Sequence, residues 1–237
     1  MDARSLPLFH ELVRVIEHYR NLRNVEIEIR FGWKHDQPRF STNIGRSFFD
    51  TIKRKLSASD LARYEETTDV HIQGVLRKVT GPNGYIIQKK KRIETIDFSV
   101  EGTPYDIRIS VCQEIPINNK STIDAWSFLR TRKRTSFQYK MWKYDMSECT
   151  LSRPTDEYVE NVCSYEMELE LNTHNIVGCS SSYIAHSGVV KILDILCMNE
   201  FEKINLKTTH LTGRNKQRTL QQSQPITQNG SKRNDVQ

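Results

Sequence analysis

Two segments near opposite ends of the chain alternate apolar and charged residues with a strict period of two. Residues 25–31 have the sequence VEIEIRF, and residues 165–171 have the sequence YEMELEL. This period is typical of a β-strand with one apolar and one charged face. The sequence therefore predicts two strands whose charged faces are mainly acidic. Those faces consist of Glu26, Glu28 and Arg30 in the first strand, and of Glu166, Glu168 and Glu170 in the second.

The rest of the chain divides into three helical segments and a run of strands. Apolar residues at helical spacing predict amphipathic helices over residues 8–20, 43–56 and 183–201. Seven or eight closely spaced strands indicate an antiparallel sheet that curls or closes, so the predicted fold class is mainly β with flanking helices. Besides the two acidic segments, alternation and turn signals predict strands over residues 67–80, 85–100, 105–115, 126–140 and 141–150.

Composition places the chain among soluble proteins. A chain of 237 residues with 37% hydrophobic residues can bury a substantial core. No segment approaches the roughly 18 consecutive apolar residues of a membrane-spanning helix, and the amino terminus is too charged for a signal peptide. The five cysteines form no C-x-x-C pair, which argues against a disulfide framework or a zinc knuckle. We therefore expect an intracellular protein with no membrane partner.

The formal charge of +6 is concentrated at the carboxyl end. Residues 213–237 are polar, with five basic residues against one acidic residue, and we expect them to form a disordered basic tail or linker. Residues 1–212 are expected to form the folded domain, whose net charge is then close to zero. A linker at this position suggests that the domain precedes another one in a longer protein.

The acidic faces admit two interpretations. A single alternating strand usually exposes its polar face to water, so either segment alone could be an ordinary surface strand. Same-face neighbours on a strand lie about 7 Å apart, and like charges that face each other across a sheet repel. A divalent cation such as Mg²⁺ or Mn²⁺, which prefers carboxylate and water oxygens, would offset that repulsion. We therefore favour metal binding by these glutamates.

Other predicted strands have basic faces. In the segment LRTRKRTSFQYK, the two-residue period places Arg130, Arg132 and Arg134 on one face. Such a face is solvated, or binds nucleic-acid backbone, or lines the interior of a closed barrel. In a closed barrel these cations would face the carboxylates, and a metal-bound polyphosphate would neutralise both sets. Further cations on predicted strands are Arg77, Lys89, Lys91 and Arg108.

Hydrolysis of a polyphosphate also requires a water molecule in line with the leaving group. A carboxylate could orient and deprotonate that water. Glu114 is a candidate because it shares a strand face with Arg108, although an exposed glutamate at a strand end would give the same pattern. The sequence contains no P-loop, dinucleotide-binding glycine motif, zinc-protease motif or nucleophile elbow.

The order of these strands resembles a known superfamily, the triphosphate tunnel metalloenzymes. The resemblance depends on the two acidic strands and on the R-x-R-x-R-x-S and W-K-Y-D-M-S strands between them, and it covers about residues 25–171. Within the superfamily the chain is similar to the metal-dependent RNA triphosphatases of fungal and viral mRNA capping, and to the amino-terminal domain of a giant-virus capping enzyme. The resemblance implies an eight-stranded antiparallel β-barrel that forms a polar tunnel. It also implies hydrolysis of the γ-phosphate of 5′-triphosphate RNA to a 5′-diphosphate end.

The resemblance further implies roles for individual residues and partners. Glu114 would position the attacking water, beside the carboxylates that bind Mn²⁺ or Mg²⁺. Expected partners are 5′-triphosphate RNA, nucleoside triphosphates as side substrates, and a covalently linked or associated guanylyltransferase domain. If the protein is viral, we expect it in a cytoplasmic factory or in the virion. The metal ligands would be Glu26, Glu28, Glu168 and Glu170; the phosphates would be held by Arg77, Lys89, Arg108, Arg130, Arg132 and Arg134; and Arg30, Glu166, Asp145 and Ser147 would support the site.

The sequence leaves alternatives open for the register of two basic strands and for the function. A shift of one residue would exchange Lys89 and Lys91 for Lys90 and Arg92, and Lys133 would replace Arg132 in the same way. One alternative function is hydrolysis of inorganic polyphosphate or thiamine triphosphate, as in other members of the superfamily. A second alternative is a non-catalytic RNA-binding module with solvated charged faces and strongly salt-dependent affinity.

Overall fold

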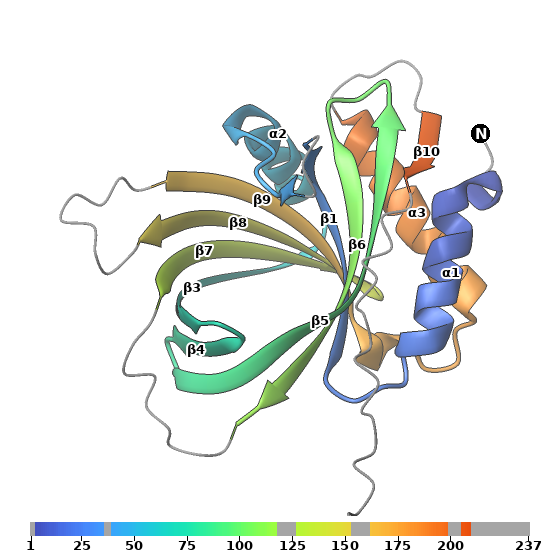
Figure 1. Cartoon of the computed structure of the whole chain (residues 1–237). Helices are drawn as coiled ribbons and strands as arrows, with labels where there is room; N and C mark the ends of the chain where they lie inside the picture. Colours follow the sequence, from blue (N-terminus) through green and yellow to red (C-terminus); the bar gives the residue numbers. More distant parts are fainter. Residues whose placement is uncertain (1–2, 36–38, 118–126, 153–161, 199–204, 210–237) are drawn as a thin grey trace, which may run out of the picture.

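A computed structural model describes residues 3–35, 39–117, 127–152, 162–198 and 205–209 (Figure 1). The tail expected over residues 213–237 lies outside these ranges. No helix within the described ranges is long and apolar enough to cross a membrane.

The strands form a closed antiparallel barrel. Each strand pairs with two neighbours in the cyclic order β1, β6, β5, β4, β3, β7, β8, β9 and back to β1. This arrangement confirms the predicted mainly β fold with flanking helices and the eight-stranded barrel (Figure 1). The barrel strands are β1 (Val25–Lys34), β3 (Ala62–Gln73), β4 (Leu76–Gly81), β5 (Gly84–Glu101), β6 (Asp106–Pro116), β7 (Phe128–Tyr139), β8 (Trp142–Ser152) and β9 (Val162–Leu171).

Two short strands extend the barrel. Strand β2 (Phe40–Ser41) pairs with the end of β1, and β10 (Asn205–Thr209) pairs with the second half of β5. The segment predicted as one strand over residues 67–80 is instead the hairpin of β3 and β4. The hairpin turns at Gly74, whose φ of 58° lies in the left-handed region that glycine adopts readily.

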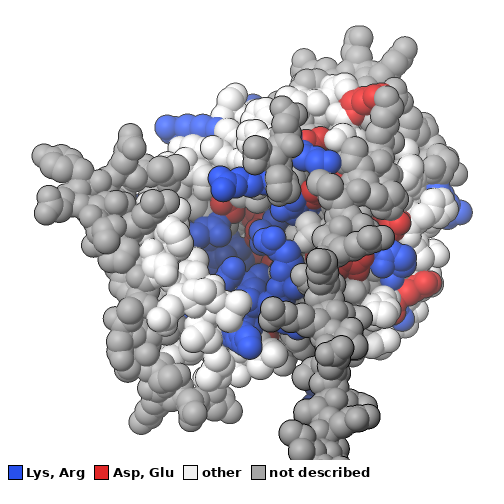
Figure 2. All heavy atoms as spheres, viewed as in Figure 1, with Lys and Arg blue, Asp and Glu red and all other residues white. Residues whose placement is uncertain are grey.

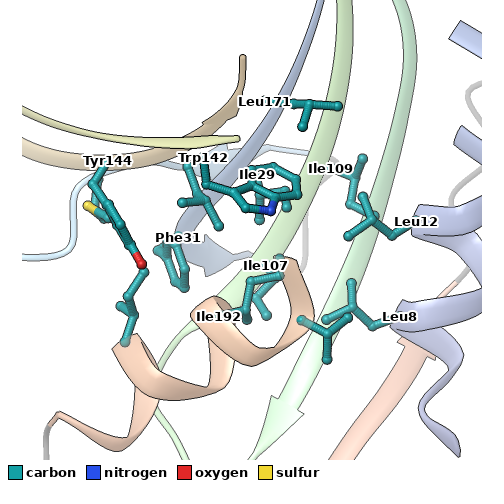
Figure 3. Close-up of a cluster of buried hydrophobic side chains, with 14 of the residues drawn as sticks. Leu8, Leu12, Ile29, Phe31, Ile107, Ile109, Trp142, Tyr144, Leu171 and Ile192 are labelled. Atoms are coloured by element: carbon teal, nitrogen blue, oxygen red, sulfur yellow. The ribbon is translucent and has the colours of Figure 1, made fainter. Parts of the chain in front are cut away.

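The main apolar core lies outside the barrel, beneath two helices. Alternation turns one apolar face of the strands outward, where α1 (Pro7–Tyr19) and α3 (Ser181–Cys197) cover it. Figure 3 shows Leu8 and Leu12 of α1 and Ile192 of α3 directed at side chains from β1, β6, β8 and β9. The outward apolar residues therefore fix the opposite, charged face toward the barrel interior. Figure 3 labels the strand residues as Ile29, Phe31, Ile107, Ile109, Trp142, Tyr144 and Leu171.

A third helix, α2 (Arg46–Ser57), packs at another part of the outer surface. Its Phe48 ring stacks on Tyr105 with a centroid distance of 4.4 Å, and its Phe49 ring contacts Tyr165 of β9 at 5.3 Å. Both aromatic contacts lie outside the barrel, so α2 also leaves the interior to polar side chains.

Candidate active site

The barrel interior brings together the charged strand faces that the sequence predicts. In the register, Glu28 of β1 lies opposite Glu170 of β9 and Ser110 of β6, and Arg30 lies opposite Glu168. Figure 2 shows Lys and Arg side chains gathered around a hollow in the molecule, with acidic side chains among them. Acids and bases from separate strands therefore share one interior, as expected for a closed barrel whose charged strand faces turn inward.

Lys90 is the central cation of one acidic cluster. Its Nζ lies 2.9 Å from a carboxylate oxygen of Glu26, 3.0 Å from one of Glu28 and 2.6 Å from one of Glu114. The Gln88 amide also donates a hydrogen bond of 2.6 Å to Glu114. The side chain of Lys90 is only 10% exposed, so this cluster is shielded from water.

The prediction that Lys89 lines the interior is wrong by one residue. Lys89 is exposed on the outer face of β5, while Lys90 on the inner face meets the acids. On β7 the predicted register is confirmed, because Arg132 is half-buried inside the barrel and Lys133 is exposed outside it.

A second network joins β1, β7, β8 and β9. Arg30 lies 2.6 Å from Glu28 and 3.0 Å from Glu168, and therefore connects the two acidic strands. Arg134 lies 3.3 Å from Glu168 and 2.8 Å from Asp145, which is fully buried. These contacts orient the acids of β9 from both sides. The network continues with Lys143 to Asp145 (3.1 Å) and Glu170 (2.9 Å), Arg130 to Glu166 (2.6 Å), the Ser136 hydroxyl to Asp145 (2.6 Å) and Arg134 Nε to the Ser147 hydroxyl (3.2 Å).

Arg108 lies inside the barrel, but an acid neutralises it. Its guanidinium binds both carboxylate oxygens of Asp97, at 2.6 and 2.9 Å. The same guanidinium lies over the ring of Phe40, 4.6 Å from the centroid. Phosphate binding by Arg108 stays a prediction, because a phosphate would have to compete with this bidentate pair.

The interior glutamates differ in the direction in which their pKa values are shifted. Burial raises the pKa of Glu26 to about 8, against the opposing effect of Lys90 and with the added repulsion of Glu28 and Glu114. For Glu28, burial also favours the neutral form, but Arg30 and Lys90 outweigh it and hold the pKa well below its usual range. Burial raises the pKa of Glu170, and Lys143 partly offsets that effect. The cluster around Lys90 thus contains more carboxylate than its cations neutralise.

Two interior arginines lack an acidic partner among the described residues. Arg77 and Arg132 form no ion pair within that part of the chain, and the buried Nε of Arg132 has no hydrogen-bond partner. Burial lowers the pKa of both guanidinium groups, and neighbouring arginines lower it further. Glu114 opposes this change for Arg77, and Glu168 opposes it for Arg132. Since a buried guanidinium without a partner is costly, this part of the interior favours an added anion.

Comparison with known proteins gives the family. The family model described as "mRNA capping enzyme, beta chain" matches residues 62–207, which is more than half of the chain. The chain belongs to this capping-enzyme family. A 5′-RNA triphosphatase of Paramecium bursaria Chlorella virus 1 is similar to it, with 29% identity over 167 residues that cover 69% of this chain and 83% of the relative.

Solved structures show the same fold as this capping-enzyme family member. The RNA triphosphatase Pct1 of S. pombe aligns with a TM-score of 0.65 and 15% identity, covering 84% of this chain and 94% of Pct1. The RNA triphosphatase domain of a trifunctional mimivirus mRNA capping enzyme aligns with a TM-score of 0.51 and 18% identity, covering 77% and 95%. At these identities the likeness establishes the barrel fold alone.

The donor set of the capping-enzyme family member suits a hard divalent cation by its chemistry. Glu28 and Glu170 lie directly opposite each other, and Glu26 shares a face with Glu28, so carboxylate oxygens come from both strands. Within the described residues, however, no group of three or more His, Cys, Asp or Glu side chains is arranged to hold a metal ion. Lys90 and Lys143 neutralise these acids instead. Metal binding by the predicted glutamates therefore stays a prediction.

Sequence reasoning missed several residues of the site. Lys143 had a usable signal, since it shares the two-residue period with Asp145 on β8. Lys90 was already the alternative to Lys89 after a shift of one residue, and Gln88 belongs to the same register of β5. Asp97 also had a usable signal, since it alternates with the apolar residues Ile96 and Phe98 after the bulge in β5.

Proposed function

We propose that this chain is a divalent-cation-dependent RNA 5′-triphosphatase, which hydrolyses the γ-phosphate of 5′-triphosphate RNA and leaves a 5′-diphosphate end. This reaction is the first step of mRNA capping. The observation that supports it most directly concerns two half-buried arginines, Arg77 and Arg132, which form no ion pair within the described residues. They lie in an interior that also contains the acids of β1 and β9. Family membership and the named viral relative support the same reaction.

The interior arginines would bind the triphosphate, and their availability differs with the acids that each one contacts. Arg132 and Arg77 can donate hydrogen bonds to phosphate oxygens without first giving up an acid of the described chain, and guanidinium groups bind phosphate through paired hydrogen bonds. Arg130 and Arg134 already contact Glu166 and Glu168, so they would share their donors between these acids and the substrate. The arginines thereby hold the negative charge of the phosphates in a fixed position.

The acids of β1 and β9 would bind the cation. Glu26, Glu28, Glu168 and Glu170 are the proposed ligands for Mg²⁺ or Mn²⁺, both of which prefer carboxylate oxygens. When bound, the cation would polarise a phosphate oxygen and neutralise charge that develops there. Lys90, which now lies among Glu26, Glu28 and Glu114, would then be free to contact the phosphates.

Glu114 is the proposed residue that orients the attacking water. Gln88 and Lys90 each contact one of its carboxylate oxygens and fix the orientation of the carboxylate. A fixed carboxylate can accept a proton from water as the water attacks phosphorus. Nucleoside triphosphates are proposed as side substrates because they present the same triphosphate, and a guanylyltransferase domain is the proposed partner for the diphosphate product.

The test uses two neighbours on β7 with opposite orientations. Arg132→Met removes an interior guanidinium, whereas Lys133→Met removes an exposed amine from the outer face of the same strand. Release of labelled γ-phosphate from triphosphate-ended RNA is measured with Mg²⁺, with Mn²⁺ and with chelator. We expect cation-dependent release, a loss in kcat/KM of about 100-fold or more in Arg132→Met, and less than about a twofold change in Lys133→Met.

Two results would contradict the proposal. Equal activity of both variants would place the reaction outside the barrel interior. No phosphate release by the folded wild-type protein with either cation, together with salt-dependent RNA binding, would indicate a non-catalytic RNA-binding module.

A further inference from the structure

Part of the barrel wall is apolar although it belongs to the interior. The register places Ile72 of β3 opposite Phe128 of β7, and Leu151 of β8 opposite Arg130 of β7. Arg130 points inward, since it contacts Glu166, so these side chains share the inner face of the wall. Leu151 is nonetheless 38% exposed, which places this apolar part where the interior opens to solvent.

These residues line a pocket of about 330 Å³. Its apolar wall consists of Ile72, Phe128 and Leu151, and its polar wall includes Arg130, Ser164 and Glu166. The volume is at the small end of the range of about 300–1,000 Å³ typical of small-molecule sites. A pocket of this size with one aromatic wall and a few polar groups suits a single small planar group.

The pocket lies beside the part of the interior that is proposed to bind phosphates. Arg130 lines the pocket and lies two residues before Arg132 on the same face of β7, which is about 7 Å along a strand. Arg130 and Glu166, whose side chains form an ion pair of 2.6 Å, both line the pocket. A group attached to phosphates at Arg132 would therefore reach the pocket without leaving the barrel.

We propose that this pocket binds the nucleoside of the first RNA nucleotide, with its base against Phe128 and Ile72. The inference rests on the proposed function, because the nucleoside is the group attached to the triphosphate. Stacking on an aromatic ring does not depend on base identity, so the pocket would accept any of the four bases. Ser164 and Glu166 offer hydrogen-bonding groups to the ribose hydroxyls. The site thus distinguishes RNA and nucleoside triphosphates from inorganic polyphosphates.

The experiment compares substrates with and without a nucleoside. KM is measured for triphosphate-ended RNA and for ATP, and inorganic tripolyphosphate is tested as substrate or as competitor of RNA. Phe128→Ala is expected to raise KM for RNA and ATP about tenfold, within the range for loss of one base–aromatic stack. The KM or inhibition constant of tripolyphosphate should change less than about twofold. Phe128→Leu, which preserves most of the volume, should have the same selective effect and guards against a folding defect.

Tyr85→Ala is the matched control. Tyr85 is an aromatic residue that is 59% exposed on the outer face of β5, where it contacts Lys78. This variant should behave as wild type with all three compounds. Equal losses for RNA, ATP and tripolyphosphate in Phe128→Leu, or no loss for any of them, would overturn the nucleoside site and leave the proposed function intact. Inactivity of the wild type toward every triphosphate would instead overturn the proposed function, and the nucleoside site with it.

Discussion

Lys90 shows how strongly one residue determines the state of the interior. Its ammonium group contacts Glu26, Glu28 and Glu114 within 3.0 Å, although its neighbour Lys89 is exposed on the other side of the strand. Without Lys90, three carboxylates would share a shielded region, and Arg30, which contacts Glu28, would be the remaining ion-pair partner among the described residues. Loss of this lysine should therefore affect stability as well as activity.

We expect Lys90→Met to lower the free energy of unfolding by about 3–5 kcal/mol at pH 7, the range for removing one partner of a buried ion pair. Lys89→Met, which removes an exposed amine from the same strand, should change it by less than about 0.5 kcal/mol. Urea unfolding followed by circular dichroism, with chelator present, measures both values. Equal stability of the two variants would show that Lys90 does not neutralise the acidic cluster.

The acids of this site were predictable from the sequence because their strands are regular. Glu26, Glu28, Glu168 and Glu170 alternate with apolar residues that must be buried, so their direction follows from that of their neighbours. The pairing of each acid with a particular cation was not predictable. Those pairs depend on the closure of the barrel, which brings together strands far apart in the sequence, such as β1 and β9.

At the scale of elements, β5 explains why part of the site escaped prediction. Its second half has an outward apolar face that includes Ile96 and Phe98, and Asp97 points inward. A strict two-residue period continued backwards from Asp97 assigns Lys89 and Lys91 to the interior. The bulge between Arg92 and Glu94 inverts the faces, so Lys90 is inside instead. A single inserted residue therefore changes which lysine faces the barrel interior.

The packing of α3 on the barrel gives a prediction for this element. A Cβ added at Gly188 would lie 2.6 Å from a ring carbon of Trp142 and 3.0 Å from Leu12, which are both fully buried. The crowding costs about 1–3 kcal/mol, and the better helix propensity of alanine recovers up to about 1 kcal/mol. We therefore expect Gly188→Ala to destabilise the fold by about 1–2 kcal/mol in thermal or urea unfolding.

The control for this variant is Ser187→Ala, one residue earlier on the same helix. Serine to alanine improves helix propensity and adds no atom, so stability should stay the same or increase slightly. Because α3 lies outside the barrel, both variants should retain wild-type phosphate release per folded molecule. Selective loss of activity in folded Gly188→Ala would contradict the separation of the helix-covered core from the interior site.

At the scale of the whole molecule, the barrel has its main apolar core outside and its charges inside. The helices stabilise the outer core, while the interior contains acids and bases that lose hydration on folding. Burial of Glu26 favours its protonated form in the folded protein. The interior suited to a highly charged ligand is therefore a destabilising part of the fold, and the effect depends on pH.

The raised pKa of Glu26 makes the pH dependence of stability measurable. The pKa of Glu26 is about 8 in the folded protein, whereas the ordinary value, which applies to the unfolded chain, is 4.5. At any pH between these two values, the folded protein therefore binds more protons than the unfolded chain. Stability must then fall as pH rises from about 5 to about 8, and Glu170, whose pKa is also raised, acts in the same direction. The lowered pKa of Glu28 affects stability only at more acidic pH.

We expect Glu26→Gln to flatten the fall of Tm with pH between pH 5.5 and 8 in the presence of chelator, and to exceed the wild-type Tm at pH 8. The amide cannot ionise, so the cost of burying a carboxylate charge is removed. Glu17→Gln, at an exposed position on α1, should follow the wild-type curve. A curve for Glu26→Gln as steep as that of wild type would mean that Glu26 ionises at its ordinary pKa. The acids would then be hydrated, and the interior would not require a bound cation to offset their repulsion.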